Sequence, residues 1–282
     1  MVERLPAVSP KAPGNHVRAT AFIYHDVLAD DGPDDSGFAG ADALSYKLSE
    51  RQFQRHLELI ASALGAGTPQ CFTDRAAAMT MSGAVVLTFD DGGASAPTRI
   101  LAALQERGWR AHFFVTTDFI GTRGFVTPAG LRELQAAGHI IGSHSASHPL
   151  RMSYLAPETM RREWRDSRAR LEDLLNAPVM VASVPGGYYS QTVATAAAEA
   201  GIRVLFTSEP RRSVSVVDGM AVVGRFSVTR RTSDGDILSL ACGRRGTALR
   251  QRLAWDAKKV AKRLGGEAWL SARRKFFELG SR

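Results

Sequence analysis

The stretch Val85-Val86-Leu87-Thr88-Phe89-Asp90-Asp91-Gly92-Gly93 decides the fold of this 282-residue chain. Its apolar and β-branched residues are typical of a strand that is buried on both faces, as in a parallel sheet. Two carboxylates and two glycines follow at once, so the strand delivers a pair of acids to the turn at its carboxyl end. By itself, a turn of this composition is more often a solvated loop than an active site.

A second motif, His144-Ser145-Ala146-Ser147-His148, follows about fifty residues later. Two imidazoles and one carboxylate can share a divalent ion and leave positions open for water, which is the arrangement of catalytic zinc. Such a site needs only one aspartate of the Asp90-Asp91 pair, so the other is available for chemistry. The two motifs together predict a divided metal site.

Strand and helix patterns alternate along the chain, which favours parallel βαβ units closed into a barrel or a barrel-like sheet. Active sites of such folds lie at the carboxyl ends of the strands. Asp90, Asp91, His25, His144 and Pro185 all follow expected strands. We expect strands at 19–25, 84–89, 111–115, 179–184, 204–206, before His144 and within 220–228, and helices at 49–64, 97–107, 128–137, 156–175 and 190–200.

The length fits one α/β barrel or two small domains, and 44% hydrophobic with 23% charged residues is ordinary globular composition. Residues 1–15 contain no apolar signal segment, and no run approaches the length of a membrane span. We therefore expect a cytoplasmic, non-secreted chain. Cys71 and Cys242 fit no disulfide or zinc-ribbon spacing, and we interpret them as reduced packing residues.

The net charge of +8 comes from the end of the chain, because residues 244–282 carry 12 Lys/Arg against 3 Asp/Glu. Residues 246–282 are predicted to form a basic amphipathic helical tail, with Leu249 and Leu253 among its apolar positions and Trp269 and Phe276 further on. The tail either packs on the domain with a solvated basic face or makes a peripheral contact with an anionic membrane. Nucleic acid is a poorer third partner, since no recognised binding motif accompanies the charge.

Three motifs resemble those of the polysaccharide deacetylases, the NodB-homology domain of carbohydrate esterase family 4. They are Thr88-Phe89-Asp90-Asp91-Gly92, His144-Ser145-Ala146-Ser147-His148 and Ser183-Val184-Pro185-Gly186-Gly187. The resemblance covers roughly residues 19–230, which we take as the catalytic domain. It implies an α/β fold, a distorted (β/α)7 barrel related to the TIM barrel.

The same resemblance implies a role for each matched residue. Asp90 would be the general base, while Asp91, His144 and His148 would bind the metal. Zinc suits one carboxylate and two imidazoles best, although Co²⁺ or Ni²⁺ could substitute. The backbone N–H of Gly186 would donate to the oxyanion of the tetrahedral intermediate.

Two departures from the family pattern concern the residues around the base. Ser183 stands where the family usually has an arginine that orients the base, and Arg225 is our candidate substitute, although a surface arginine is an equal alternative. The late Leu-x-His that supplies the acid is missing, since 238–240 reads Leu-Ser-Leu. The segment 22–27, Phe-Ile-Tyr-His-Asp-Val, resembles the opening of the circularly permuted branch that includes poly-N-acetylglucosamine deacetylases, which implies that His25 is the acid.

The resemblance therefore implies a metal-dependent hydrolase that removes N-acetyl groups from amino sugars of a glycan or a lipid-linked saccharide. Hydrolysis of another amide, such as a formyl group, a cyclic imide or a ureide, would use the same groups. A degenerate, non-catalytic sugar-binding domain is the alternative outside enzymes. The intact set of Asp90, Asp91, His144 and His148 weighs against it, because a binding module needs neither a metal triad nor a spare base.

Overall fold

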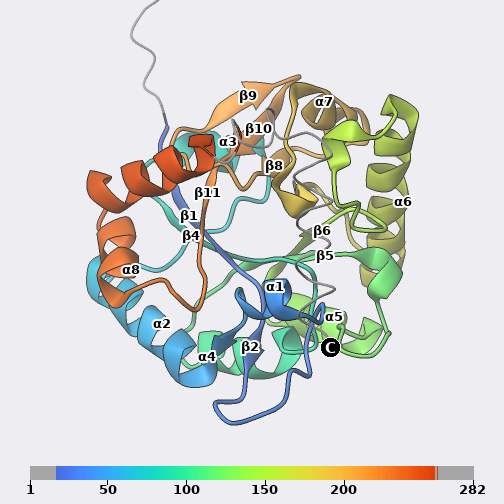
Figure 1. Ribbon diagram of the computed structural model, residues 1–282. Helices are drawn as coiled ribbons and strands as arrows, with labels where there is room; N and C mark the ends of the chain where they lie inside the picture. The colour runs from blue at the N-terminus through green and yellow to red at the C-terminus, as the bar shows by residue number, and fades with distance from the viewer. Residues whose placement is uncertain (1–16, 258, 260–282) are drawn as a thin grey trace, which may run out of the picture.

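The computed structural model describes residues 17–257 and 259, and it shows a central sheet surrounded by helices (Figure 1). The strands of this sheet are β1 (Thr20–Tyr24), β4 (Val85–Phe89), β5 (His112–Val115), β6 (Ile140–Ser143), β7 (Val181–Ser183), β8 (Val204–Phe206), β9 (Ser215–Val217), β10 (Met220–Val223) and β11 (Arg225–Ser227). They are arranged in the order β11-β1-β4-β5-β6-β7-β8-β10-β9. Only the β10–β9 pair is antiparallel among the described strands.

The two halves of segment 220–227 pair with strands that lie far apart in this strand order. β10 pairs with β8 and β11 pairs with β1, and Gly224 alone separates the two strands in sequence. A side chain at Gly224 would come within 2.6 Å of two backbone carbonyl oxygens, so only glycine fits there. The one strand expected within 220–228 is thus two strands, which together complete a barrel-like arrangement of the parallel strands.

Most helices occupy the segments expected from the sequence. They are α2 (Glu50–Leu64), α4 (Leu101–Gln105, preceded by a π-helical turn at Ala96–Ile100), α5 (Pro128–Ala136), α6 (Pro157–Leu175) and α7 (Gln191–Glu199). Shorter elements were not expected: α1 (Ala41–Leu44), α3 (Arg75–Thr80), α8 (Asp234–Ala241) and the two-residue strands β2 (Val27–Leu28) and β3 (Leu48–Ser49). The Ser49 side chain caps α2 by accepting the Gln52 N–H.

An aromatic cluster holds the strands that carry the site against α2. Tyr24 lies 5.6 Å from both Phe53 and Phe89, and Phe89 stacks on Phe113 at 4.9 Å between ring centroids. All four side chains are buried. Burying each ring stabilises the fold by about 1.5–3 kcal/mol, so the ends of β1, β4 and β5 rest on a rigid base.

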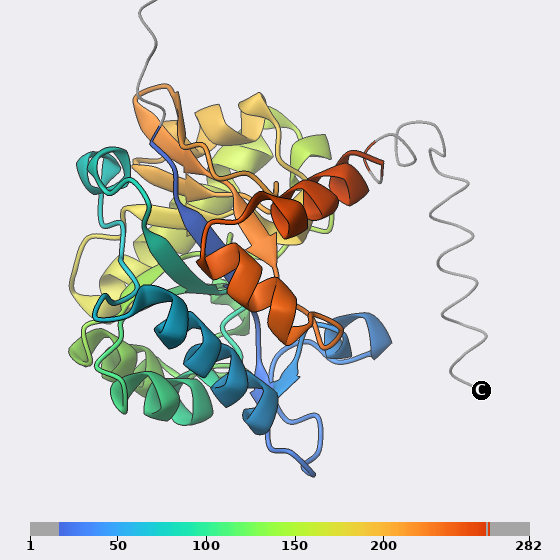
Figure 2. The same ribbon diagram turned by 90° about the vertical axis from the view of Figure 1, so that its left-hand side faces the viewer.

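The beginning of the predicted tail is a helix. Residues 245–257 are helical and follow α8, and Figure 2 shows the two helices next to each other in red and orange. Leu249 and Leu253 are 55% and 61% exposed, so most of the surface of these two side chains is not packed against the domain. Trp269, Phe276 and the rest of 260–282 lie outside the described residues.

Two smaller expectations concern the cysteines and membrane spans. Cys71 and Cys242 are both free thiols, but Cys242 is exposed and therefore is not a packing residue. Within residues 17–257, no helix is long and apolar enough to cross a membrane.

Candidate active site

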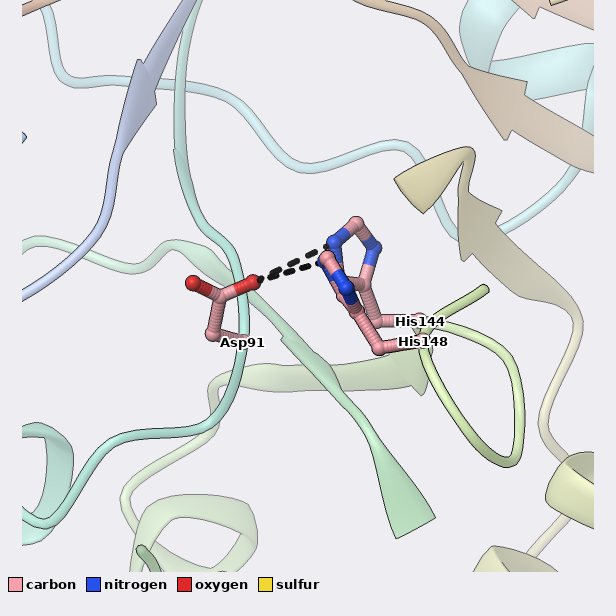
Figure 3. A group of neighbouring side chains, drawn as sticks. All are labelled: Asp91, His144 and His148. Atoms are coloured by element: carbon pink, nitrogen blue, oxygen red, sulfur yellow. Dashed lines mark ion pairs between the residues drawn. The ribbon is translucent and has the colours of Figure 1, made fainter. Parts of the chain in front are cut away.

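Asp91, His144 and His148 meet at the carboxyl edge of the sheet (Figure 3). Asp91 follows β4, His144 follows β6, and His148 lies in the loop beyond it. The Nε2 atoms of both histidines lie 3.4 Å from the same Asp91 oxygen, and one ligand atom from each residue falls within 4.8 Å of the others. This donor set fits a divalent ion bound by one carboxylate and two imidazoles.

The backbone around these ligands is unusual. Asp91, Ser145 and His148 have φ of 75°, 65° and 56°, a left-handed conformation that costs non-glycine residues free energy. Glu163 on α6 holds the histidine loop in this shape, because its carboxylate accepts the N–H groups of Ala146 and Ser147 at 3.0 and 2.9 Å. Glu163 could not be identified from the sequence, because no motif marks it.

Hydrogen bonds orient the first histidine. The Nδ1 of His144 lies 3.0 Å from the carbonyl oxygen of Ser183, so Nδ1–H donates there and Nε2 remains available as a ligand atom. His148 is tied by its backbone, whose N–H donates to the Ser145 hydroxyl at 3.1 Å. These contacts set the ring orientation of one ligand and the loop position of the other.

Asp90 is paired with Arg225. The guanidinium donates to both carboxylate oxygens, with Nη1–Oδ1 at 2.7 Å and Nη2–Oδ2 at 2.8 Å, and also to Ser183 Oγ at 2.5 Å. Ser183 Oγ lies 3.2 Å from Asp90 Oδ2. The serine therefore joins a hydrogen-bonded network with the arginine, which approaches from another strand.

Burial and charge oppose each other at Asp90. Burial would raise the pKa of this carboxyl, but the Arg225 guanidinium and the nearby His144 outweigh it and hold the pKa below its ordinary value. Arg225 is the first residue of β11 and is fully buried, so the alternative of a surface arginine is wrong. Asp90 is thus kept ionised beside the triad, with its His144 Nε2 distance at 3.9 Å.

His25 follows β1, the strand next to β4. A positive charge on this ring would lower the pKa of both Asp90 and Asp91, so the three residues are close enough to interact. The ring lies 4.9 Å from that of Tyr46, and Nδ1 is buried with no hydrogen-bond partner among the described residues. A histidine in this position can exchange a proton with a group bound between it and Asp90.

Gly186 and Gly187 form a tight turn after β7. Their φ values are 62° and 71°, both left-handed, which glycine adopts readily. A Cβ on Gly186 would lie 3.0 Å from the carbonyl oxygen of Leu150, in the loop that follows His148. The turn therefore lies directly beside the histidine loop.

Asp26 explains the second glycine of the Asp-Asp-Gly-Gly turn. A Cβ on Gly93 would lie 1.9 Å from Asp26 Oδ1, so no side chain fits at that position. Asp26 is buried and accepts hydrogen bonds from the Ser95 and Ser36 hydroxyls. The sequence analysis did not assign this aspartate, whose carboxylate packs beneath the turn that carries Asp91.

The fold and the site define a class: an α/β barrel with a carboxylate–imidazole triad that could hold a metal ion and a second, ionised carboxylate beside it. The comparisons agree with this class. The family profile "Polysaccharide deacetylase" matches residues 78–205, and over that region the chain is similar to the polysaccharide deacetylases.

Two curated proteins illustrate the sequence similarity. YxkH of Bacillus subtilis (strain 168), which carries the name of a polysaccharide deacetylase, is 28% identical over 145 residues, 51% of this chain and 51% of that protein. Chitin deacetylase of Colletotrichum lindemuthianum is 35% identical over 71 residues, 25% of this chain and 29% of that protein. The chain thus spans about half or less of the length of these relatives.

Solved structures show the same fold at low sequence identity. IcaB from Ammonifex degensii matches with a TM-score of 0.63 at 20% identity, over 80% of this chain and 97% of that chain. A polysaccharide deacetylase from Bacillus cereus matches with a TM-score of 0.65 at 16% identity, over 80% of this chain and 69% of that chain.

Proposed function

We propose that this protein is a metal-dependent hydrolase that removes an N-acetyl group from an amino sugar and releases acetate. The observation that carries the proposal is Asp90, a buried carboxylate held ionised by Arg225 beside the triad of Asp91, His144 and His148. A purely structural metal site has no use for such a base. The match of residues 78–205 to the polysaccharide deacetylase profile supports an acetylated saccharide as the substrate class.

Each residue of the site then has one role. Asp91, His144 and His148 would hold the ion, for which zinc is the best match and cobalt or nickel are substitutes. When bound there, the ion would supply Lewis acidity to the acyl carbonyl and would lower the pKa of water. Asp90 accepts the proton of the attacking water as it adds to the acetyl carbon.

The remaining steps use His25 and Gly186. As the C–N bond breaks, His25 donates a proton to the departing nitrogen, which leaves as an amine while the acyl group leaves as acetate. The N–H of Gly186 donates to the oxyanion of the tetrahedral intermediate. Burial of His25 Nδ1 and the charge coupling of this ring to Asp90 support the assignment of the acid.

Exposed aromatic side chains next to the site support a saccharide ligand. Tyr154 is 69% exposed, and its ring lies 6.1 Å from that of Tyr188, which follows Gly187. The Arg151 guanidinium lies 5.3 Å from the Tyr154 ring centroid and 5.9 Å from that of Tyr188. Flat rings with a cation beside them offer apolar and hydrogen-bonding surface to a sugar.

The test combines metal content with acetate release from N-acetylglucosamine oligomers and lipid-linked acetylated sugars. We expect bound metal and acetate from the parent, and a large loss of acetate release with Asp90→Asn. Release of formate from an N-formyl sugar without acetate release would transfer the assignment to a deformylase. Bound metal with no hydrolysis of any acyl substrate would favour a non-catalytic sugar-binding domain, and failure to bind metal would refute the proposal.

A groove at the side of the barrel supports an additional contact with an anionic membrane. The groove has a volume of about 840 Å³ and lies between the 245–257 helix and the 210–216 segment, with the exposed side chains Leu249 and Val216 on its rim. No acidic residue lines it among those described, and its cations are Arg18, Arg211, Arg212, Arg245 and Arg252. Arginines beside apolar side chains suit a phospholipid surface.

Vesicle co-sedimentation tests this contact. We expect binding to phosphatidylglycerol vesicles, little binding to phosphatidylcholine vesicles, and a clear loss when Arg245 and Arg252 are both changed to Gln. The matched control changes Arg165 and Arg161 on α6, which are paired with acids away from the groove. Equal binding of the groove variant and the parent would eliminate the groove as the contact.

A further inference from the structure

The helix at 245–257 lies outside both the matched region and the predicted catalytic domain, yet its contacts lead to the site. Thr247, Gln251, Trp255 and Lys259 are spaced four residues apart, so they form one stripe along the helix. Thr247 donates to an aspartate of α8 at 3.1 Å, Gln251 donates to the carbonyl at the end of β11 at 3.3 Å, and Lys259 pairs with a glutamate in the loop after β8. The stripe thus anchors the helix to three separate elements.

Trp255 contacts the turn after β7. A Cβ on Gly187 would lie 2.8 Å from Trp255 Cη2, closer than real side chains approach, so the indole occupies the space next to this glycine. On the other side of the turn, Gly186 approaches the Leu150 carbonyl, where its Cβ would lie at 3.0 Å. The two glycines therefore lie between a backbone carbonyl and an indole ring.

The indole is held by packing rather than by a hydrogen bond. Its Nε1–H is buried and has no partner among the described residues. Leaving a buried donor unpaired is unfavourable, and natural folds retain few such groups. A smaller side chain at this position would avoid that cost but would leave the two-glycine turn without its neighbour.

We propose that Trp255 is a positioning residue that clamps the Gly186–Gly187 turn, and that the catalytic unit extends through Lys259. Two consecutive left-handed glycines are conformationally permissive, so their N–H groups are aimed only if neighbouring atoms restrict them. An oxyanion donor acts well only when it is preorganised. The proposal rests on the role of Gly186 in the proposed function.

Trp255→Ala is the test, with Leu253→Ala as its control because Leu253 lies two residues away on the same helix and is 61% exposed. We expect kcat of Trp255→Ala to fall about tenfold, since removing an oxyanion donor outright costs on the order of 100-fold or more. KM and the metal stoichiometry should stay at the parent values. Trp255→Phe should restore most of kcat, and Leu253→Ala should match the parent.

Hydrogen–deuterium exchange of the peptide spanning 184–189 separates this proposal from the proposed function, because it needs no turnover. We expect faster exchange of this peptide in Trp255→Ala and parent-like exchange in Leu253→Ala. Should Trp255→Ala not fold, Trp255→Leu takes its place in both measurements. Parent-like exchange and parent-like kcat in a folded, metal-bound Trp255 variant would overturn the clamp. Faster exchange in the Trp255 variant, together with a parent protein that hydrolyses no substrate, would retain the clamp and remove the proposed activity.

Discussion

Replacing Arg225 by glutamine removes the counter-ion of a carboxylate that is buried inside the barrel. The guanidinium is fully buried and donates five hydrogen bonds, two of them to Asp90, which is only 4% exposed. After the substitution, Ser183 is the remaining side-chain donor to that carboxylate. Breaking a buried ion pair from one side costs about 3–5 kcal/mol, so we expect Arg225→Gln to lower the free energy of unfolding by about that amount at pH 7.

The loss should depend on pH with a defined sign. In the parent, the pKa of folded Asp90 lies below its unfolded value, so its contribution to stability is present above about pH 3.9 and is lost as pH falls through the folded pKa. In Arg225→Gln, burial dominates and raises the folded pKa above the unfolded value. The ionised Asp90 therefore destabilises the folded variant at neutral pH, and protonation of Asp90 on acidification removes this destabilisation. The gap in unfolding free energy between the two proteins should narrow as pH falls from 7 towards about 4.

Urea unfolding of chelator-treated proteins at several pH values measures this gap. Arg212→Gln is the matched control, because Arg212 is a partly buried arginine that donates to the Thr20 hydroxyl and to two backbone carbonyls. Its gap to the parent should stay constant with pH. A gap for Arg225→Gln that is equally constant would refute the ion-pair reasoning and leave Arg225 with a packing role only.

Three further predictions concern individual groups of the site. Asp90→Asn should keep the metal stoichiometry of the parent and lose on the order of 100- to 10,000-fold in kcat. Asp91→Asn should instead lose metal in elemental analysis. Metal loss in both variants would contradict the proposed roles of Asp90 as base and Asp91 as ligand. His25→Gln should slow hydrolysis of an acetamide far more than that of an activated acetate ester, whose leaving group needs no proton, and equal losses on both would exclude His25 as the acid. Glu163→Gln should weaken metal affinity by about 10- to 100-fold in a competition titration with a chelator, and an unchanged affinity would show that the histidine loop holds its shape without it.

Local patterns in the sequence were enough for the barrel and for most of the ligand positions. The apolar run before Asp90 is β4, the Ser49 cap begins α2, and alternating strand and helix segments correspond to the observed elements. These features depend on residues a few positions apart, whose periodicity and capping are legible in one chain. The positions of the motifs after expected strands then predicted that Asp91, His144 and His148 lie at one edge of the sheet, because parallel strands have their carboxyl ends at the same edge.

The contacts that hold the site residues in place could not be derived from the sequence in the same way. Arg225 reaches Asp90 across 135 residues of sequence. Trp255, which contacts Gly187, lies on a helix for which the sequence left packing and membrane contact as alternatives. Glu163 gives no signal at all, although it holds the histidine loop. The missing family arginine pointed to Arg225 as a candidate substitute, but only the structure distinguished this role from the alternative of a surface arginine.

The sequence by itself determined the class of fold, the candidate metal-binding motifs and the presence of a second carboxylate, because each follows from residues that are close in the chain. Only the tertiary structure decided which groups orient those residues. Gly224 separates β10, which pairs with β8, from β11, which pairs with β1. Because β11 lies next to β1, its first residue, Arg225, reaches Asp90. Strand register and the direction of side chains across a barrel depend on contacts between distant segments, and no local periodicity encodes them.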